Sequence, residues 1–589
     1  MEEKQMFEIK DNFYLNGEPF QIVSGAFHYF RTVPEYWRDR LEKLKNMGCN
    51  TVETYIPWNF HEPKQGEFLW EGMHDICRFI ETATELGLYI IIRPSPYICA
   101  EWEFGGLPAW LLKDRSMRLR CCHDAYLKAV KDYYSMLIPK LVPYQIDHGG
   151  NIILMQIENE YGYYGNETAY LEFLRDTMRK LGVTVPFVTS DGPWSESNFK
   201  AGCVEGALPT GNFGSNVEWQ FDVMKKYMGT DKPLMCMEFW VGWFDAWGDE
   251  AHHHGSELSQ NQKDLEELMR TGHVNFYMFQ GGTNFGFMSG RNGGSKTADV
   301  TSYDYDAILT EDGQITEKYK AFKEIIGRYH RICEVPLTTE IKRKSYGKLT
   351  CTGKVDLFSV LDKIAAPIHS SYPLTMEDID QPYGYLLYRT KVKDYECATD
   401  IRLEDAADRV QTYQNGKYLF TAFAENIWEK FEIAESEQTP GGIIDLLCEN
   451  IGRENFGTGL ENQRKGIRGG VKINDHRHFG YDIYALPLDE QQIEKLDFSC
   501  GYSEGVPAFY QYELEVDEPG DTFLDFEGFG KGCVFVNGFN LGRFWEIGPQ
   551  KRLYLPAPLL KKGHNTIIIF ETEGKAGETV SLADEPLLG

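Results

Sequence analysis

Carboxylates stand directly after several apolar runs of this sequence, where two of them could work as a pair. Glu160 follows the run "NIILMQIEN", and Glu238 follows "PLMCM". Two facing carboxyl groups suit glycoside hydrolysis, in which one group protonates the leaving oxygen and the other attacks the anomeric carbon or activates water. A separation of about 5 to 5.5 Å would indicate a retaining mechanism and a longer gap an inverting one. The residues alone leave both mechanisms open.

Two neighbours of Glu160 bear on this assignment. Asn159 would supply an amide to the sugar hydroxyl beside the reacting carbon, a contact that strengthens as charge develops in the transition state. Glu158 is a competing acid, because on strand alternation it would share the inward face with Glu160. We prefer Glu160 because it lies closer to the expected strand end.

Eight short apolar runs must position these polar side chains, and helix-like segments separate the runs. In "PEYWRDRLEKLKNMG", apolar residues recur every three or four positions and Gly48 is a plausible helix stop. Eight strand-then-helix units are the count of a TIM barrel, and non-alternating apolar strands suit a sheet buried on both faces. We therefore predict a (β/α)8 TIM barrel over residues 1–334. The predicted strands lie near Ile22, Glu53, Ile91, Met155, Val188, Leu208, Cys236 and Tyr277.

The polar residues that follow these runs should gather at one end of the barrel. In a TIM barrel the active site lies at the C-terminal ends of the strands. Carboxylates, aromatic rings and amides follow five of the runs, with no lysine among them. This lining is the one expected for a neutral sugar.

The rest of the chain changes to short alternating segments separated by Gly, Pro, Asp and Asn. Residues 373–485 and 486–589 each predict a β-sandwich of jelly-roll type, and the connecting segment 335–372 is expected to add strands to a β-domain. The dipeptides Asn415-Gly416 and Asn537-Gly538 stand between strand-like runs and predict hairpin turns.

Composition limits the possible partners and location. The 589 residues include 60 Lys plus Arg and 89 Asp plus Glu, so the net charge of −29 disfavours nucleic acids and anionic membrane surfaces. We expect no secretory signal, and no apolar run reaches membrane-spanning length. Thirteen cysteines without a CxxC pair favour reduced thiols, so we expect a cytoplasmic protein.

Long ordered motifs across nearly the whole chain closely resemble family 35 glycoside hydrolases, the β-galactosidases. They include "SGAFHYFR", "TYIPWNFHEP", "RPSPYICAEWEFGGLPAWL", "MQIENEYG", "YMFQGGTNFG" and "VFVNGFNLGRFW". The resemblance implies that Glu160 is the acid/base, since it follows Asn in the Asn-Glu pair, and that Glu238 is the nucleophile. It also implies retention of configuration and no metal or organic cofactor. The implied galactose-binding residues are Tyr55, Cys99, Ala100, Glu101, Asn159, Tyr277 and Tyr305.

Two aromatic residues, Trp240 and Phe456, depart from relatives in the family. Trp240 stands where those relatives carry Tyr, and with Trp243 it is expected to wall the subsite of the leaving sugar, or aglycone. Phe456 stands where relatives carry a Tyr that leans over the same subsite. In these features the chain is similar to small cytoplasmic bacterial members selective for β-1,3-linked galactose, as in Gal-β-1,3-GlcNAc or Gal-β-1,3-GalNAc.

The leading hypothesis is therefore an exo-acting, retaining β-galactosidase acting on small oligosaccharides. A broader β-galactosidase or transgalactosylase, and a non-hydrolytic carbohydrate-binding protein, remain alternatives. The run His252-His253-His254 lacks the spacing of helix metal sites and predicts a loop. The β-domains are expected to brace the barrel, and they are candidates for pairing two subunits into a homodimer.

Overall fold

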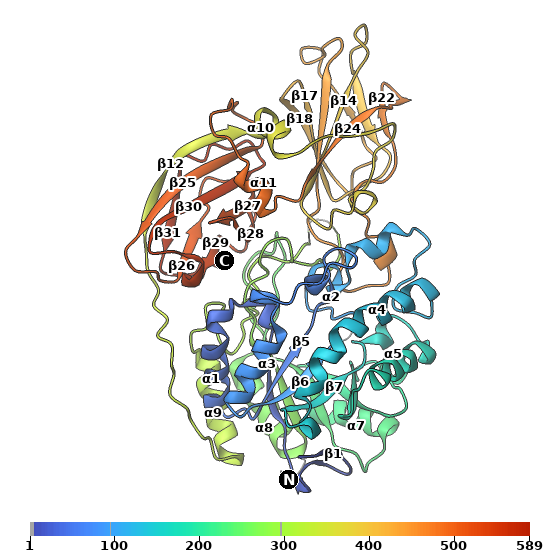
Figure 1. Ribbon diagram of the computed structural model, residues 1–589, viewed down its shortest axis with the longest axis vertical. Helices are drawn as coiled ribbons and strands as arrows, with labels where there is room; N and C mark the ends of the chain where they lie inside the picture. The colour runs from blue at the N-terminus through green and yellow to red at the C-terminus, as the bar shows by residue number, and fades with distance from the viewer. Residues whose placement is uncertain (1–4, 95, 295–296) are drawn as a thin grey trace.

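The computed structural model describes residues 5–94, 96–294 and 297–589 (Figure 1). Eight parallel strands close into a barrel in the order β10-β11-β4-β5-β6-β7-β8-β9. Strands lie at all eight predicted places and confirm the TIM barrel. They are β4 (Val23–Phe27), β5 (Thr51–Tyr55), β6 (Tyr89–Arg93), β7 (Ile152–Gln156), β8 (Phe187–Asp191), β9 (Ala207–Asn212), β10 (Met235–Trp240) and β11 (His273–Gln280).

Helices surround the barrel and bury its outer face. The first helix ends as predicted at Gly48, whose φ of 111° is the left-handed conformation that glycine adopts without strain. A side chain at Gly48 would also meet Ile326, because a Cβ atom there would lie 2.7 Å from the Ile326 Cγ2 atom. The helices are α1 (Trp37–Met47), α3 (Ile76–Glu85), α4 (Asp124–Leu141), α5 (Thr168–Lys180), α6 (Glu196–Ala201), α7 (Val217–Met228), α8 (Leu258–Thr271) and α9 (Glu317–Tyr329).

A small antiparallel sheet near the N-terminus was not predicted. It consists of β1 (Phe7–Ile9), β2 (Phe13–Leu15) and β3 (Glu18–Pro19). Phe7 and Phe13 belong to the core of the barrel, so this sheet packs on the barrel rather than standing free. In Figure 1, β1 lies at the lower end of the barrel, and the two all-β domains lie above the opposite end.

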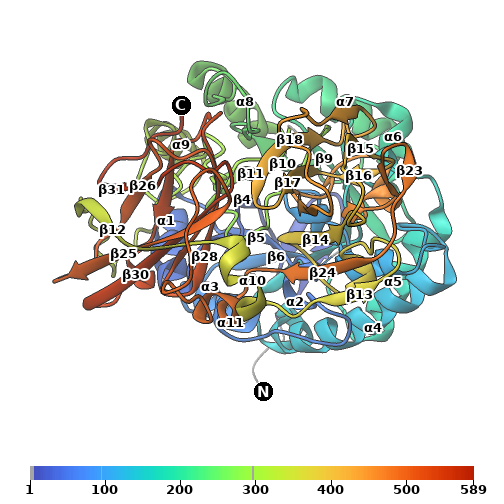
Figure 2. The same ribbon diagram turned by 90° about the horizontal axis from the view of Figure 1, so that it is seen from above.

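The middle domain is built from two antiparallel sheets that share a core containing Tyr388 and Leu403. Seen from above, this domain lies over the barrel (Figure 2). The six-stranded sheet runs β13 (Ile368–Ser370), β24 (Tyr481–Leu486), β14 (Tyr385–Lys391), β20 (Ile443–Glu449), β17 (Arg409–Gln414) and β18 (Lys417–Phe423). The four-stranded sheet runs β19 (Lys430–Glu432), β15 (Asp400–Leu403), β22 (Val471–Ile473) and β23 (His476–Arg477).

The last domain contains a strand from much earlier in the chain. After α9 the chain runs along one side of the molecule to β12 (Gly347–Asp356) (Figure 1). This strand pairs with both β25 (Ala508–Val516) and β31 (Thr579–Ala583). Its last residue, Asp356, lies opposite Ala508. The full order is β28 (Phe539–Trp545), β27 (Lys531–Val536), β30 (Gly563–Glu571), β25 (Ala508–Val516), β12, β31 (Thr579–Ala583), β26 (Thr522–Asp525) and β29 (Arg552–Leu555). Two all-β domains thus follow the barrel, as predicted.

Both predicted hairpin turns are confirmed. Asn415-Gly416 joins β17 to β18, and Asn537-Gly538 joins β27 to β28. All four residues have positive φ, the geometry that the short turns of twisted hairpins require. All thirteen cysteines are free thiols. Within the described part of the chain, no helix has both the length and the apolar character needed to cross a membrane.

Candidate active site

Glu238, in β10, is held by three side chains in a cavity of about 280 Å³. Arg93 Nη2 lies 2.7 Å from Glu238 Oε1, and the Tyr55 hydroxyl donates to the same oxygen at 2.8 Å. Trp240 Nε1 donates to Oε2 at 3.1 Å. Because both oxygens are engaged, the orientation of this carboxylate is fixed before any substrate arrives.

Arg93 was not predicted as a site residue, although it is the last residue of its apolar run and ends β6. Arg93 is fully buried, and its guanidinium carbon lies 3.9 Å from the centroid of the Tyr55 ring. Its Nε atom lies 3.8 Å from Glu53 Oε1. Burial alone would lower the pKa of Arg93, but Tyr55, Glu238 and Glu53 more than offset it and the pKa is raised. A permanent positive charge therefore sits beside Glu238.

Glu160 has a different environment. It follows β7 in left-handed backbone with φ of 47°, and its Oε1 accepts from Asn212 Nδ2 at 3.0 Å. Burial, reinforced by the charge of Glu238, raises the pKa of Glu160 to about 7. One carboxyl group is thus paired with a cation, while the other can hold a proton near neutral pH. Nucleophile and acid roles require this difference in environment between two carboxyl groups.

Glu158 does not line this cavity. Its two oxygens accept from Arg120 at 2.9 and 2.8 Å, so it is neutralised in a buried ion pair. The expectation that Glu158 shares an inward strand face with Glu160 was wrong. Both residues lie beyond the end of β7 in left-handed backbone, where strand alternation does not apply.

A turn after β6 contributes three further predicted residues. Cys99, Ala100 and Glu101 have φ of 58°, 56° and 49°, an uncommon run of left-handed residues that strained turns at functional sites often contain. Arg31 donates to the Ala100 carbonyl and so fixes the turn. Tyr303 donates to Glu101, and burial raises the pKa of Glu101 to about 7.

The structure brings all twelve predicted site residues to one cavity. They are Tyr55, Cys99, Ala100, Glu101, Asn159, Glu160, Glu238, Trp240, Trp243, Tyr277, Tyr305 and Phe456. The prediction missed four more lining residues, Ile98, Trp194, Phe244 and Asn292. The position of Trp194 in the sequence could have indicated it, because it follows the fifth predicted strand in "VPFVTSDGPW".

Phe456 reaches this cavity from the middle domain. Its neighbour Asn455 accepts a hydrogen bond from Tyr97 of the barrel at the main-chain oxygen. Arg453, three residues before Phe456, is buried and forms ion pairs with Glu103 of the barrel and Glu377 of the middle domain. The middle domain therefore supplies part of the site wall through a firmly anchored loop.

One group of possible metal ligands lies beside the site. Within the described residues, Asp245, Asp249 and His253 bring ligand-type atoms within 4.8 Å of one another. Asp245 accepts from His252 Nδ1 at 2.6 Å and from the His253 main chain at 2.7 Å, so hydrogen bonds account for this arrangement. The three consecutive histidines lie in a loop, as predicted.

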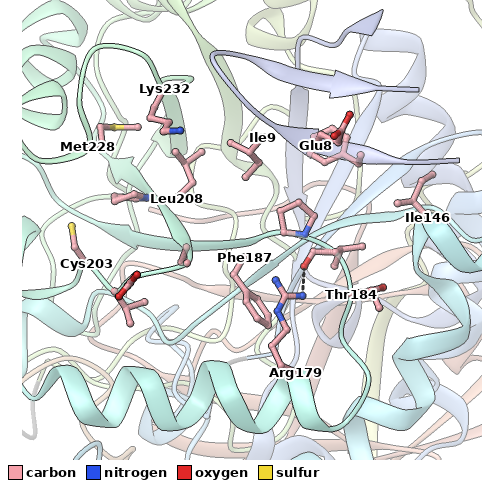
Figure 3. Close-up of a pocket in the computed structure, with 18 of the residues that line it drawn as sticks. Glu8, Ile9, Ile146, Arg179, Thr184, Phe187, Cys203, Leu208, Met228 and Lys232 are labelled. Atoms are coloured by element: carbon pink, nitrogen blue, oxygen red, sulfur yellow. Dashed lines mark hydrogen bonds between the residues drawn. The ribbon is translucent and has the colours of Figure 1, made fainter. Parts of the chain in front are cut away.

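A larger cavity, of about 880 Å³, lies at the other end of the barrel (Figure 3). There Arg179 lies over the Phe187 ring at 4.0 Å and donates to the carbonyls of Val183 and Val185, each at 2.8 Å. None of the predicted site residues is among the described residues that line it. Convergence of chemical groups, not cavity size, marks the candidate active site.

Comparison with known proteins agrees with this geometry. Residues 12–329 match the family described as "Glycosyl hydrolases family 35". Residues 373–487 match "Beta-galactosidase, first all-beta domain", and residues 507–565 match "Beta-galactosidase, galactose-binding domain".

The relatives match along nearly their whole length. Human "Beta-galactosidase-1-like protein 2" is 38% identical, with 98% of this chain and 91% of the relative covered. Human "Beta-galactosidase" is 36% identical over 100% of this chain and 91% of the relative. "Beta-galactosidase 1" of Dictyostelium discoideum is 35% identical over 95% and 91%. The chain therefore belongs to glycosyl hydrolases family 35 and is a glycoside hydrolase.

Proposed function

We propose that this glycoside hydrolase is an exo-acting, retaining β-galactosidase that releases terminal β-D-galactose from small oligosaccharides. The observation that carries the proposal is the contrast between two carboxyl groups in one cavity, Glu238 beside Arg93 and Glu160 beside Asn212. The names of the relatives support galactose as the released sugar.

In the first step, a Glu238 oxygen attacks the anomeric carbon while Glu160 gives its proton to the leaving oxygen. The bond to the leaving sugar breaks with its electron pair on that oxygen, and galactose remains as an ester of Glu238. In the second step, Glu160 takes a proton from water, and the hydroxide formed displaces Glu238. Two inversions restore the original configuration.

The buried end of the cavity suits a single terminal galactose. Tyr55, Tyr277 and Tyr305 line this end and are each almost completely buried. Arg93 Nη2 donates to Asn159 Oδ1 at 2.7 Å, which orients the Asn159 amide for the hydroxyl beside the reacting carbon. A blind, buried end of this kind favours removal of chain ends over cleavage within a chain.

The open end supports a preference for β-1,3 linkages. Trp240 and Trp243 form one wall with ring centroids 6.0 Å apart, and Phe456 lies on the wall supplied by the middle domain. Aromatic rings contributed by two domains restrict the orientations that a leaving sugar can take. Rates on β-1,3-, β-1,4- and β-1,6-galactosyl disaccharides test the preference, and equal rates on all three would contradict it.

Proton NMR of the first product tests the mechanism. A retaining enzyme releases β-galactose, which then equilibrates with the α form, whereas an inverting enzyme releases α-galactose. E238G in the presence of azide provides a second test, because azide can replace the missing carboxylate. The expected product is α-galactosyl azide, and its absence together with initial release of α-galactose would overturn the proposal.

A further inference from the structure

Trp194 lines the active-site cavity but has no role in the proposed mechanism. It follows β8, and 45% of its side chain is exposed at the cavity mouth. Single exposed tryptophans are unremarkable on a protein surface, as Trp219 on α7 illustrates with 51% exposure. Trp194 differs because it shares a cavity with the two carboxyl groups.

Trp194 ends a row of three rings that come from three separate parts of the fold. The Phe456 ring, from the middle domain, lies 6.0 Å from the ring of Tyr163, which follows β7. The Tyr163 ring lies 4.7 Å from that of Trp194. The single ring of Tyr163 thus separates Trp194 from Phe456, the residue expected at the first leaving sugar.

The local backbone holds the Trp194 indole in place. A Cβ atom on Gly192 would lie 2.4 Å from Trp194 Nε1, so the indole folds back against the glycine main chain. Pro193 between them restricts the backbone further. A preorganised aromatic surface of this kind binds a ligand without first losing side-chain freedom.

The aromatic residues that line the cavity range from buried to exposed. Tyr55 at the galactose end is 1% exposed, Phe456 is 39% exposed and Trp243 is 42% exposed. The exposed rings that line the cavity come from three places: Trp243 from the loop after β10, Phe456 from the middle domain and Trp194 from the loop after β8. An exposed apolar surface continuous with an active site marks a place for more ligand.

We propose that Trp194 is the stacking platform for a second leaving-group sugar, so that the enzyme favours galactosides of three or more sugar units. The inference rests on the proposed function and extends it. The reacting galactose occupies the buried end, the first leaving sugar lies at Trp240, Trp243 and Phe456, and the next sugar stacks on Trp194. Neutral sugar faces suit an uncharged aromatic platform in a chain with net charge of −29.

Kinetics on two matched substrates test this site. The disaccharide Gal-β-1,3-GlcNAc and the trisaccharide Gal-β-1,3-GlcNAc-β-1,3-Gal share the cleaved bond and differ only in the second leaving sugar. We expect kcat/KM of the native enzyme to be about 3- to 10-fold higher for the trisaccharide. W194A should abolish this advantage by lowering kcat/KM for the trisaccharide more than for the disaccharide, whereas W194F should keep part of it.

Two further variants serve as controls for effects that do not depend on the Trp194 surface. W219A removes an equally exposed tryptophan far from the cavity and should change neither substrate. G192A leaves Trp194 present but displaces its indole, so it should also reduce the trisaccharide advantage. Equal kcat/KM for both substrates in the native enzyme, or an equal loss on both in W194A, would overturn the inference.

Binding to an inactive variant separates this inference from the proposed function. In E238Q, calorimetry should show tighter binding of the trisaccharide than of the disaccharide, and adding W194A should remove the difference. If the native enzyme cleaves neither substrate, the proposed function fails, and this measurement still decides whether Trp194 binds the second sugar.

Discussion

Arg93 and Glu238 form a buried ion pair inside the barrel, with 2.7 Å between Nη2 and Oε1. The two residues come from strands β6 and β10, which are not neighbours in the sheet. The pair therefore joins two sides of the barrel mouth and fixes the carboxylate to which we assign the attack on the sugar.

Replacing Arg93 should damage catalysis more than substrate binding. R93M leaves Glu238 buried without its cation, a change that costs about 3–5 kcal/mol when one partner of a buried pair is removed. We expect kcat/KM to fall by a factor of about 10² or more, with R93K retaining part of the activity. R38M, which breaks the exposed pair between Arg38 and Glu85, is the matched control and should leave kcat/KM unchanged. Near-native turnover by R93M would refute the role of the pair.

Tyr55 should contribute through its hydroxyl group. Y55F removes the hydroxyl that donates to Glu238 at 2.8 Å, while keeping the ring. Since hydrogen bonds to charged groups contribute about 1.5–3 kcal/mol, we expect kcat/KM to fall about 10- to 100-fold. An unchanged melting temperature would show that the loss is catalytic, and unchanged kcat/KM would contradict the prediction.

Activity should fall as pH rises through about 7. Glu160 must be protonated to act as the acid, and burial next to Glu238 raises its pKa to about 7. The alkaline limb of kcat/KM should therefore have a midpoint near 7 and should disappear in E160Q, measured on an aryl galactoside whose leaving group needs no proton. Glu101, whose pKa burial also raises to about 7, provides the control. If E101Q, and not E160Q, removes the limb, the assignment of the acid is wrong.

Glu53 should make folding stability depend on pH. Burial raises the pKa of Glu53 to about 7, so the folded protein holds this proton more tightly than the unfolded chain does. The resulting stabilisation is complete below the unfolded pKa of about 4.3 and is lost as pH rises through about 7. We expect the decrease in melting temperature between pH 5.5 and 8 to be smaller in E53Q than in the native protein. An identical decrease would show that Glu53 does not contribute.

The contact between the barrel and the middle domain should depend on Asp408. This buried carboxylate accepts from Lys465 at 2.7 Å and from Arg291 of the barrel at 3.0 Å. D408N leaves two buried cations uncompensated and should destabilise the protein by about 3–5 kcal/mol, measured as a lower midpoint of thermal or denaturant unfolding. D405N, which affects the half-exposed pair with Arg468, should cost less than about 1 kcal/mol. Equal effects of the two variants would contradict this interpretation.

The barrel could be predicted because its burial pattern determines which residue types stand in and after each strand. Strands buried on both faces must be apolar throughout, and active-site groups must follow their C-terminal ends. Glu160 and Glu238 were found in that way. Arg93 was missed because it is the last residue of an apolar run, and because its role depends on Glu238 from a strand that is distant in the sequence. No spacing along the chain reveals such a pair.

The wall from the middle domain was harder to predict in full. Phe456 was found by resemblance, whereas Trp194 lies in a loop with no apolar period, and its neighbour Tyr163 comes from another loop. Their meeting depends on how three parts of the fold dock. The position of β12 also depends on docking, since its alternating residues fit either β-domain and only tertiary packing selects its partners.

The pairing of β12 with β25 has a consequence for how the protein is made. Because Asp356 and Ala508 lie opposite each other, the chain leaves the last domain and returns to it at one place, so the middle domain is an insertion. During synthesis, β12 emerges long before its partner strands and must wait unpaired while residues 357–507 follow. The barrel and the inserted domain can fold as units in that interval. The last domain is then completed only after β31 has been made.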